Sequence, residues 1–68
     1  MPVPALKLYV DKVRIEKGIS IRALAERAGI SKSHVQRIEA GETSPTLEVM
    51  CRIAKALDVP ITDLFSYK

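Results

Sequence analysis

The sequence has few of the residues that mark secreted, membrane-spanning or metal-binding proteins. Its 68 residues include one cysteine (Cys51), one histidine (His34) and three aromatic residues (Tyr9, Phe65 and Tyr67). A single thiol can form neither an internal disulfide nor a cluster of metal ligands, so we expect a reducing, cytoplasmic setting and neither a metal nor a cofactor. No apolar run approaches the roughly 18 residues that a membrane span requires, so no membrane association is expected. With few aromatic residues, aliphatic side chains must build the core.

What the chain does contain suits one small folded domain. Apolar residues make up 47% of the sequence and charged residues 28%, a balance typical of globular proteins. Residues 1–4 include Pro2 and Pro4 and lack both a basic segment and a long apolar segment. We therefore predict that residues 1–4 form a short N-terminal arm and not a signal peptide. Residues 5–68 are predicted to form the single domain.

Glycine and proline residues divide the chain into short segments that have apolar residues at helical spacing. In the first segment Leu6, Val10 and Val13 follow this spacing, and in the last Pro60 suits the first turn of a helix. Strict alternation of apolar and polar residues is missing, so strands are not expected. The predicted fold class is all-α, a compact bundle of five short helices over about 5–17, 20–28, 31–39, 46–57 and 60–66.

Residues 20–39 carry the pattern of a helix-turn-helix unit. Ser20 and Ser31 are good N-caps for two successive helices, and Gly29 between them can adopt the left-handed backbone of a tight turn. The second of these helices has only Val35 and Ile38 as an apolar edge, so its other side chains must face solvent. Two short helices joined in this way place the second one in the major groove of DNA.

Four outward-facing side chains of this second helix are suited to reading base edges, namely Lys32, Ser33, Gln36 and Arg37. Arginine and lysine donate hydrogen bonds to guanine, glutamine pairs with adenine, and serine serves either. Residues 22–37 also contain four Lys or Arg residues and a single acidic one. The pattern predicts sequence-specific binding of double-stranded DNA, and hence a transcriptional regulator. A plain solvated helix face is the alternative interpretation.

Several motifs resemble, in the same order, those of the phage-repressor/Cro-type (XRE-like) helix-turn-helix regulators. The resemblance extends from about residue 10 to residue 65 and rests on Arg14, KGIS at 17–20, LAERAGIS at 24–31, IEAG at 38–41, PTL at 45–47 and AKAL at 54–57. It implies the fold of these DNA-binding domains and the function of a repressor or controller protein. It also implies a salt bridge between Arg14 and Glu39, which would tie the first helix to the end of the third.

The resemblance also assigns DNA contacts to individual residues. Lys32, Ser33 and Arg37 occupy the family's base-contacting positions, and Gln36 assists them. Contacts with the DNA backbone are implied for Ser20, Arg22, Ser31, His34, Thr43 and Ser44, with simple solvent exposure as the alternative for His34. The chain departs from the family at Ile21, where a DNA-contacting glutamine is usual. Ile21 is expected either to pack against Ile15 or to touch a thymine methyl group.

The resemblance leads us to expect a homodimer on a roughly palindromic operator. Its two recognition helices would enter successive major grooves about 34 Å apart. We expect the dimer contact to use Ile61, Leu64, Phe65 and Tyr67, with completion of a monomer's core as the alternative for Leu64 and Phe65. Cys51 is expected to be a buried small apolar residue of the fourth helix rather than a redox sensor.

Two other classes of function must be weighed against DNA binding. A protein-interaction module, such as an antitoxin or an anti-repressor with a protein partner, would keep the same fold. Such a module does not require a basic outward-facing helix, and a combination of DNA and protein binding stays open. An enzyme is not expected, because the sequence shows no nucleophile beside a base, no carboxylate pair and no glycine-rich phosphate loop.

Overall fold

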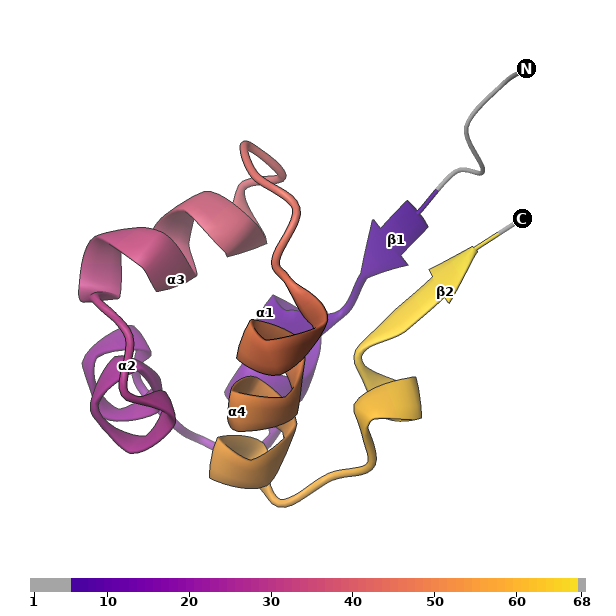
Figure 1. Ribbon diagram of the computed structural model, residues 1–68. Helices are drawn as coiled ribbons and strands as arrows, with labels where there is room; N and C mark the ends of the chain where they lie inside the picture. The colour runs from indigo at the N-terminus through magenta and orange to yellow at the C-terminus, as the bar shows by residue number, and fades with distance from the viewer. Residues whose placement is uncertain (1–5, 68) are drawn as a thin grey trace.

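A computed structural model describes residues 6–67, which form four α-helices, one 3₁₀ turn and a two-stranded antiparallel sheet. In chain order the elements are β1 (Leu6–Leu8), α1 (Val10–Glu16), α2 (Ile21–Ala28), α3 (Lys32–Glu39), α4 (Leu47–Leu57), the 3₁₀ turn η1 (Ile61–Asp63) and β2 (Phe65–Tyr67). Figure 1 shows α2 and α3 on one side of α4, with the paired strands β1 and β2 on the other side. The predicted arm of residues 1–4 lies outside the described residues.

Hydroxyl side chains begin three of the four helices. Ser20, Ser31 and Thr46 each accept a hydrogen bond from the backbone N–H three residues later, at 3.0, 3.0 and 3.2 Å. Each of these bonds satisfies a donor that the first turn of a helix leaves unpaired. The helices predicted over 20–28, 31–39 and 46–57 therefore begin as expected, each directly after its capping residue.

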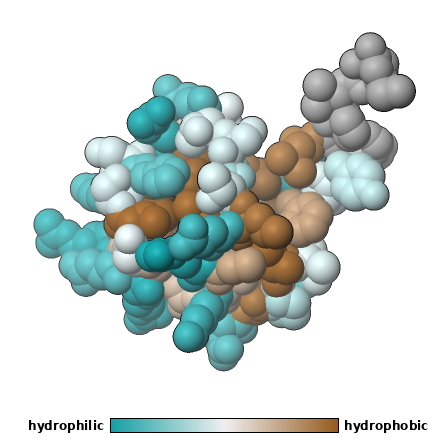
Figure 2. Space-filling model, in the orientation of Figure 1, coloured by the Kyte–Doolittle hydropathy of each residue, from teal (hydrophilic) through white to brown (hydrophobic). Residues whose placement is uncertain are grey.

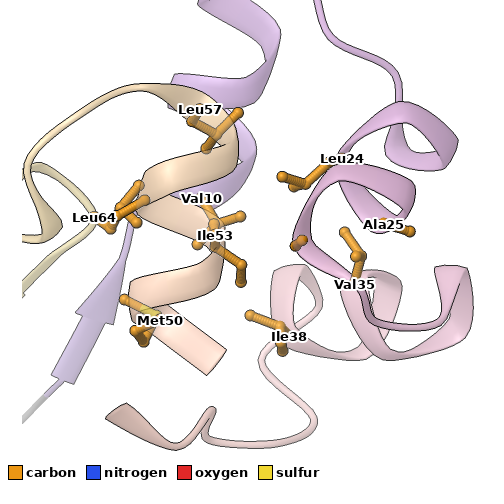
Figure 3. Packing of buried hydrophobic residues seen from close by; sticks show 11 residues of the cluster. Val10, Leu24, Ala25, Val35, Ile38, Met50, Ile53, Leu57 and Leu64 are labelled. Atoms are coloured by element: carbon orange, nitrogen blue, oxygen red, sulfur yellow. The ribbon is translucent and has the colours of Figure 1, made fainter. Parts of the chain in front are cut away.

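The core is aliphatic, as the shortage of aromatic residues predicted. The side chains of α4 meet those of α2 and α3 at its centre, and Figure 3 shows them converging between these helices. The buried residues are Val10, Leu24, Ala25, Ala28, Val35, Ile38, Met50, Ile53, Ala54, Leu57 and Leu64. This core fixes α3 against the rest of the molecule along one edge only.

The N-terminal segment is where the all-α prediction first proves wrong. The predicted helix over residues 5–17 begins only at Val10, and residues 6–8 form β1. Leu6, placed in the core by the helical spacing, is 53% exposed. In a strand, successive side chains point to opposite faces, so Leu6 and Leu8 share one face and Lys7 lies on the other.

The C-terminal segment is the second correction. The predicted fifth helix over 60–66 is reduced to the 3₁₀ turn η1, and Phe65–Tyr67 pairs with β1 as β2. Aromatic residues favour strands because they fit a pleated, half-buried surface. The bundle within residues 6–67 therefore has four α-helices rather than five, together with a sheet that joins the two ends of this segment.

The prediction that Cys51 is buried is also wrong. The thiol is exposed, whereas its neighbour Met50 is 6% exposed and belongs to the core. Consecutive helical residues are separated by 100° around the helix axis, as follows from 3.6 residues per turn. This step turns Cys51 away from the core that Met50 shares with Ile53, Ala54 and Leu57. Leu47, one turn before Cys51, lies toward the same side of the helix and is 74% exposed.

Candidate nucleic-acid interface

The exposed face of α3 is built by burying the opposite edge of this helix. Val35 and Ile38 are 0% and 1% exposed, and they pack against α2 and α4. The four predicted base-reading residues, Lys32, Ser33, Gln36 and Arg37, are all exposed. Within residues 6–67 none of the four takes part in a salt bridge. Their side chains are therefore available to an external ligand along the length of the helix.

The turn between α2 and α3 fixes the angle of this exposed face. Gly29 has a backbone φ of 70°, the left-handed conformation that glycine adopts without steric cost. The N–H of Ile30 donates to the C=O of Ala25 at 3.1 Å and closes the end of α2. Ala25 is buried, and its small side chain belongs to the core between the helices. The predicted helix-turn-helix unit of residues 20–39 is thus present, with its two helices at 21–28 and 32–39.

Arg14 ties three parts of this arrangement together. Its Nε lies 2.7 Å from Oε2 of Glu39 and its Nη2 lies 3.1 Å from Oε1, so the guanidinium and carboxylate groups form a two-pronged ion pair. Nη1 donates to the C=O of Ile19 at 3.0 Å. Because Arg14 belongs to α1, Ile19 precedes α2 and Glu39 ends α3, one side chain links all three helices. The salt bridge that the resemblance implied is formed.

The ion pair is largely shielded from solvent. The side chains of Arg14 and Glu39 are 13% and 11% exposed. The hydrogen bonds that Arg14 donates to Glu39 raise the pKa of the Arg14 guanidinium above its ordinary value, and the negative charge of the carboxylate adds to this effect, while burial opposes it. The positive charge is therefore fixed in place, and the end of α3 cannot swing away without separating two opposite charges.

The residues expected to contact the DNA backbone fall into three groups. The hydroxyls of Ser20 and Ser31 are already engaged as helix caps, which leaves the backbone N–H groups of these helix starts for any phosphate. Arg22 is exposed at the first turn of α2, and His34 is half-buried on α3. Thr43 and Ser44 lie in the loop after α3 and line a hollow shared with β1 and the end of that helix.

The departure of the sequence from the family at Ile21 can be placed in the structure. Ile21, at the start of α2, is half-buried and packs against the core. Ile15, the neighbour proposed for it, is 64% exposed on α1. Ile21 therefore packs against the core, while its expected contact with Ile15 or with a thymine methyl group stays a prediction.

The four residues expected at a dimer contact do not share one environment. Leu64 is 0% exposed and belongs to the core, so its assignment to a dimer contact is wrong: it cannot reach a second chain without local unfolding. Ile61 and Phe65 are half-buried, and Tyr67 is 69% exposed on β2. Sequence reasoning also missed Leu6 and Leu47, which are exposed beside these residues.

Two properties of residues 6–67 bear on the classes of function. Among residues 6–67, no three His, Cys, Asp or Glu side chains come together in a group that could hold a metal ion. Over the same residues, no helix combines the length and the apolar character needed to cross a membrane.

The arrangement of α1 to η1 matches that of known proteins. A helix-turn-helix family model matches residues 10–64. The chain belongs to the helix-turn-helix family. Among its curated relatives, the HTH-type transcriptional regulator SutR of Escherichia coli K12 is 36% identical over 61 residues, which are 90% of this chain and 34% of SutR. The HTH-type transcriptional regulator SlrR of Bacillus subtilis 168 is 40% identical over 61 residues, 88% of this chain and 38% of SlrR.

A solved member of the same fold supports this assignment. The restriction-modification controller protein C.AhdI from Aeromonas hydrophila superimposes with a TM-score of 0.78 at 30% identity, over 79% of this chain and 82% of that one. The chain spans about a third of the length of the two curated regulators named above. The family match leaves out β1 and β2, which lie on either side of residues 10–64.

Proposed function

We propose that this chain is a sequence-specific regulator of transcription that reads the major groove of double-stranded DNA with α3. The observation that carries the proposal is the contrast between the two edges of this helix. Val35 and Ile38 are buried, while four side chains able to hydrogen-bond with base edges are exposed on the other side. A helix held at a fixed angle, with its polar residues outward, is what major-groove recognition requires.

The regulatory role in this proposal is taken from the helix-turn-helix relatives of the chain. The relatives SutR and SlrR are named as transcriptional regulators, and C.AhdI as a controller protein. We therefore assign this chain the role of a repressor or controller that acts as a homodimer on a palindromic operator in the cytoplasm. Lys32, Ser33, Gln36 and Arg37 contact bases in this proposal, and the residues around the starts of α2 and α3 contact phosphates.

Selection of bound sites from a random pool of duplex oligonucleotides tests the proposal. A regulator of this kind enriches one motif, with two inverted half-sites if the dimer is correct. The matched control is the variant Lys32→Ala/Gln36→Ala/Arg37→Ala, which keeps the core edge of α3 and should enrich no motif. A wild-type protein that fails to bind any duplex at low ionic strength would exclude the proposed function.

Arg22→Ala is expected to weaken binding to all DNA sequences by a similar factor. Arg22 is exposed at the first turn of α2, where we assign it to a phosphate rather than to a base. Loss of one phosphate contact should reduce the slope of log affinity against log salt by about 0.9. Lys55→Ala, which removes an exposed cation from α4, is the control with the same change in net charge and should leave the slope nearly unchanged. A changed motif in Arg22→Ala would instead indicate a base contact.

A further inference from the structure

The sheet formed by β1 and β2 is not part of the fold that the family match describes. That match covers residues 10–64, whereas the strands lie at Leu6–Leu8 and Phe65–Tyr67. The helices that carry the proposed DNA site are complete without the sheet. The two strands therefore call for an explanation of their own.

The outer edge of β2 carries main-chain groups that point away from β1. The register places Phe65 and Tyr67 opposite the two leucines of β1, and in the same register the N–H of Tyr9 donates to the C=O of Leu64 at 2.8 Å. Directly opposed residues in an antiparallel ladder alternate between hydrogen-bonded and non-hydrogen-bonded pairs. Tyr9 and Leu64 form a hydrogen-bonded pair, so the next pair, Leu8 with Phe65, is non-hydrogen-bonded, and so is Leu6 with Tyr67. The N–H and C=O groups of Phe65 and Tyr67 therefore face outward and are available to another strand.

Apart from its length of three residues, this edge lacks the features that keep strands from pairing between molecules. Phe65, Ser66 and Tyr67 include no charged residue and no proline, and the register of the strand contains no bulge. Natural proteins protect exposed edges with such features. The other strand differs, because β1 carries Lys7 and lines a hollow together with the loop after α3. Figure 1 shows β2 at the outer margin of the molecule.

An apolar groove lies on one face of the sheet, next to this edge. Its walls come from β1, the loop before α4, the start of α4, η1 and β2, and only apolar residues line it. Leu6 and Leu47, two of these residues, are 53% and 74% exposed, and Tyr67, opposite Leu6 in the sheet, is 69% exposed. Figure 2 shows the apolar surface over β1 and the start of α4. Clustered exposed apolar residues of this kind mark interaction sites.

We propose that a second copy of this chain pairs with the edge of β2, so that two sheets join into one of four antiparallel strands. A two-fold axis midway between the two copies of Ser66 would set Phe65 of each copy opposite Tyr67 of the other. The outward N–H and C=O groups of both residues would then be hydrogen-bonded. The axis runs perpendicular to the sheet, so the apolar faces of both copies lie on the same side. Two copies of this chain repel each other, because each carries a net charge of +3. This surface suits a second copy because neither Phe65–Tyr67 nor the lining of the groove brings a charged side chain to the contact.

A disulfide trap tests the register of this pairing. In the Cys51→Ala background, Ser66→Cys would place two thiols opposite each other in a non-hydrogen-bonded pair, with Cα atoms about 4.5 Å apart. This separation lies within the range that a disulfide spans. Mild oxidation of the full chain without DNA should then give a covalent dimer. Thr62→Cys in the same background is the control, because Thr62 is exposed close by but lies outside β2 and should remain monomeric.

Sedimentation equilibrium of the full chain without DNA tests the contribution of the main chain and of the groove. Tyr67→Pro removes an outward N–H without touching the hydrogen bonds to β1, whereas Tyr67→Ala keeps that N–H. With two symmetric bonds lost, the dimer Kd should rise about tenfold or more beyond that of Tyr67→Ala. Leu47→Glu should also weaken the dimer, and Ile15→Glu, which changes an exposed apolar residue on α1, should not.

The strand pairing rests on the proposed function in one respect: it supplies the contact surface of the homodimer proposed there. The strand pairing and the proposed function can nevertheless fail separately. A chain that stays monomeric at all concentrations, or that gives equal Kd values for Tyr67→Pro and Tyr67→Ala together with no trapped dimer, would overturn the strand pairing. If such a chain still binds a single DNA half-site, the proposed function survives. A dimer that forms as described but ignores duplex DNA would overturn the proposed function and leave the pairing intact.

Discussion

Replacement of Glu39 by alanine should lower the free energy of unfolding by about 3 kcal/mol, the lower end of the range for one partner removed from a buried ion pair. The Arg14 side chain is 13% exposed, and without the carboxylate its only remaining hydrogen-bond partner within residues 6–67 would be the C=O of Ile19 at 3.0 Å. The cost is therefore that of an unpaired, shielded charge. Urea unfolding at neutral pH measures this loss, and the melting temperature should fall by more than about 10 °C in a domain of this size.

The protein offers a matched control for this prediction. Glu48 forms an ion pair with Arg52 at 3.2 Å, but the two side chains are 77% and 50% exposed. Glu48→Ala should therefore change the stability by less than about 0.5 kcal/mol, as is usual for exposed pairs four residues apart. Equal losses in Glu39→Ala and Glu48→Ala would show that the Arg14–Glu39 pair is no more than a surface contact. A milder effect of Glu39→Ala/Arg14→Met than of Glu39→Ala alone would identify the unpaired charge as the cause.

The part of the fold that could be predicted from the sequence is the part with local signals. Ser20 and Ser31 mark helix starts by a hydrogen bond that spans three residues, and Gly29 marks the turn by its backbone conformation. Val35 and Ile38 define the buried edge of α3 by their spacing alone. Each of these signals lies within about one turn of helix, so the helix-turn-helix unit and the exposed face of α3 could be predicted from the sequence.

The sheet could not be predicted because its cause is not local. Leu6 pairs with Tyr67, which lies almost at the other end of the chain, and the residue pattern of neither segment indicates that it pairs with the other. Three residues are also too few to distinguish a strand from a helix, since Leu6, Val10 and Val13 fit helical spacing as well. In the same way, the ion pair of Arg14 and Glu39 joins residues 25 positions apart. It was predicted from the family resemblance and not from the physics of either segment.

The exposure of Leu47 and Cys51 shows a further limit. Apolar residues are so frequent in α4 that the helix could be rotated about its axis by one residue position and still bury a similar number of apolar side chains. The structure selects the rotation that buries Met50, Ile53 and Leu57 and leaves Leu47 at the edge of the apolar groove. Which apolar residues of a helix remain exposed depends on the other segments that pack against it, and the spacing within one helix does not contain this information.

Arg37→Ala is expected to remove the preference for one base pair in each half-site. Arg37 is exposed on α3 and has no salt-bridge partner within residues 6–67, so its guanidinium can reach the O6 and N7 atoms of a guanine. A good two-pronged contact of this type discriminates between bases by about 1–3 kcal/mol. Affinity for the selected site should therefore fall by about tenfold to a hundredfold. Affinity for a site already mutated at that base pair should change little.

Arg37→Lys separates base reading from phosphate contact at this position. Lysine keeps the positive charge but cannot offer the planar pair of donors that matches a guanine edge. If Arg37 reads a base, the lysine variant should lose most of the preference at that position while keeping the salt dependence of the wild type. If Arg37 instead contacts a phosphate, lysine should restore both affinity and preference, and Arg37→Ala should resemble Arg22→Ala. Binding titrations against the selected site and its single-base variants, at two salt concentrations, distinguish these results, because only a base contact couples the loss of affinity to the identity of one base pair.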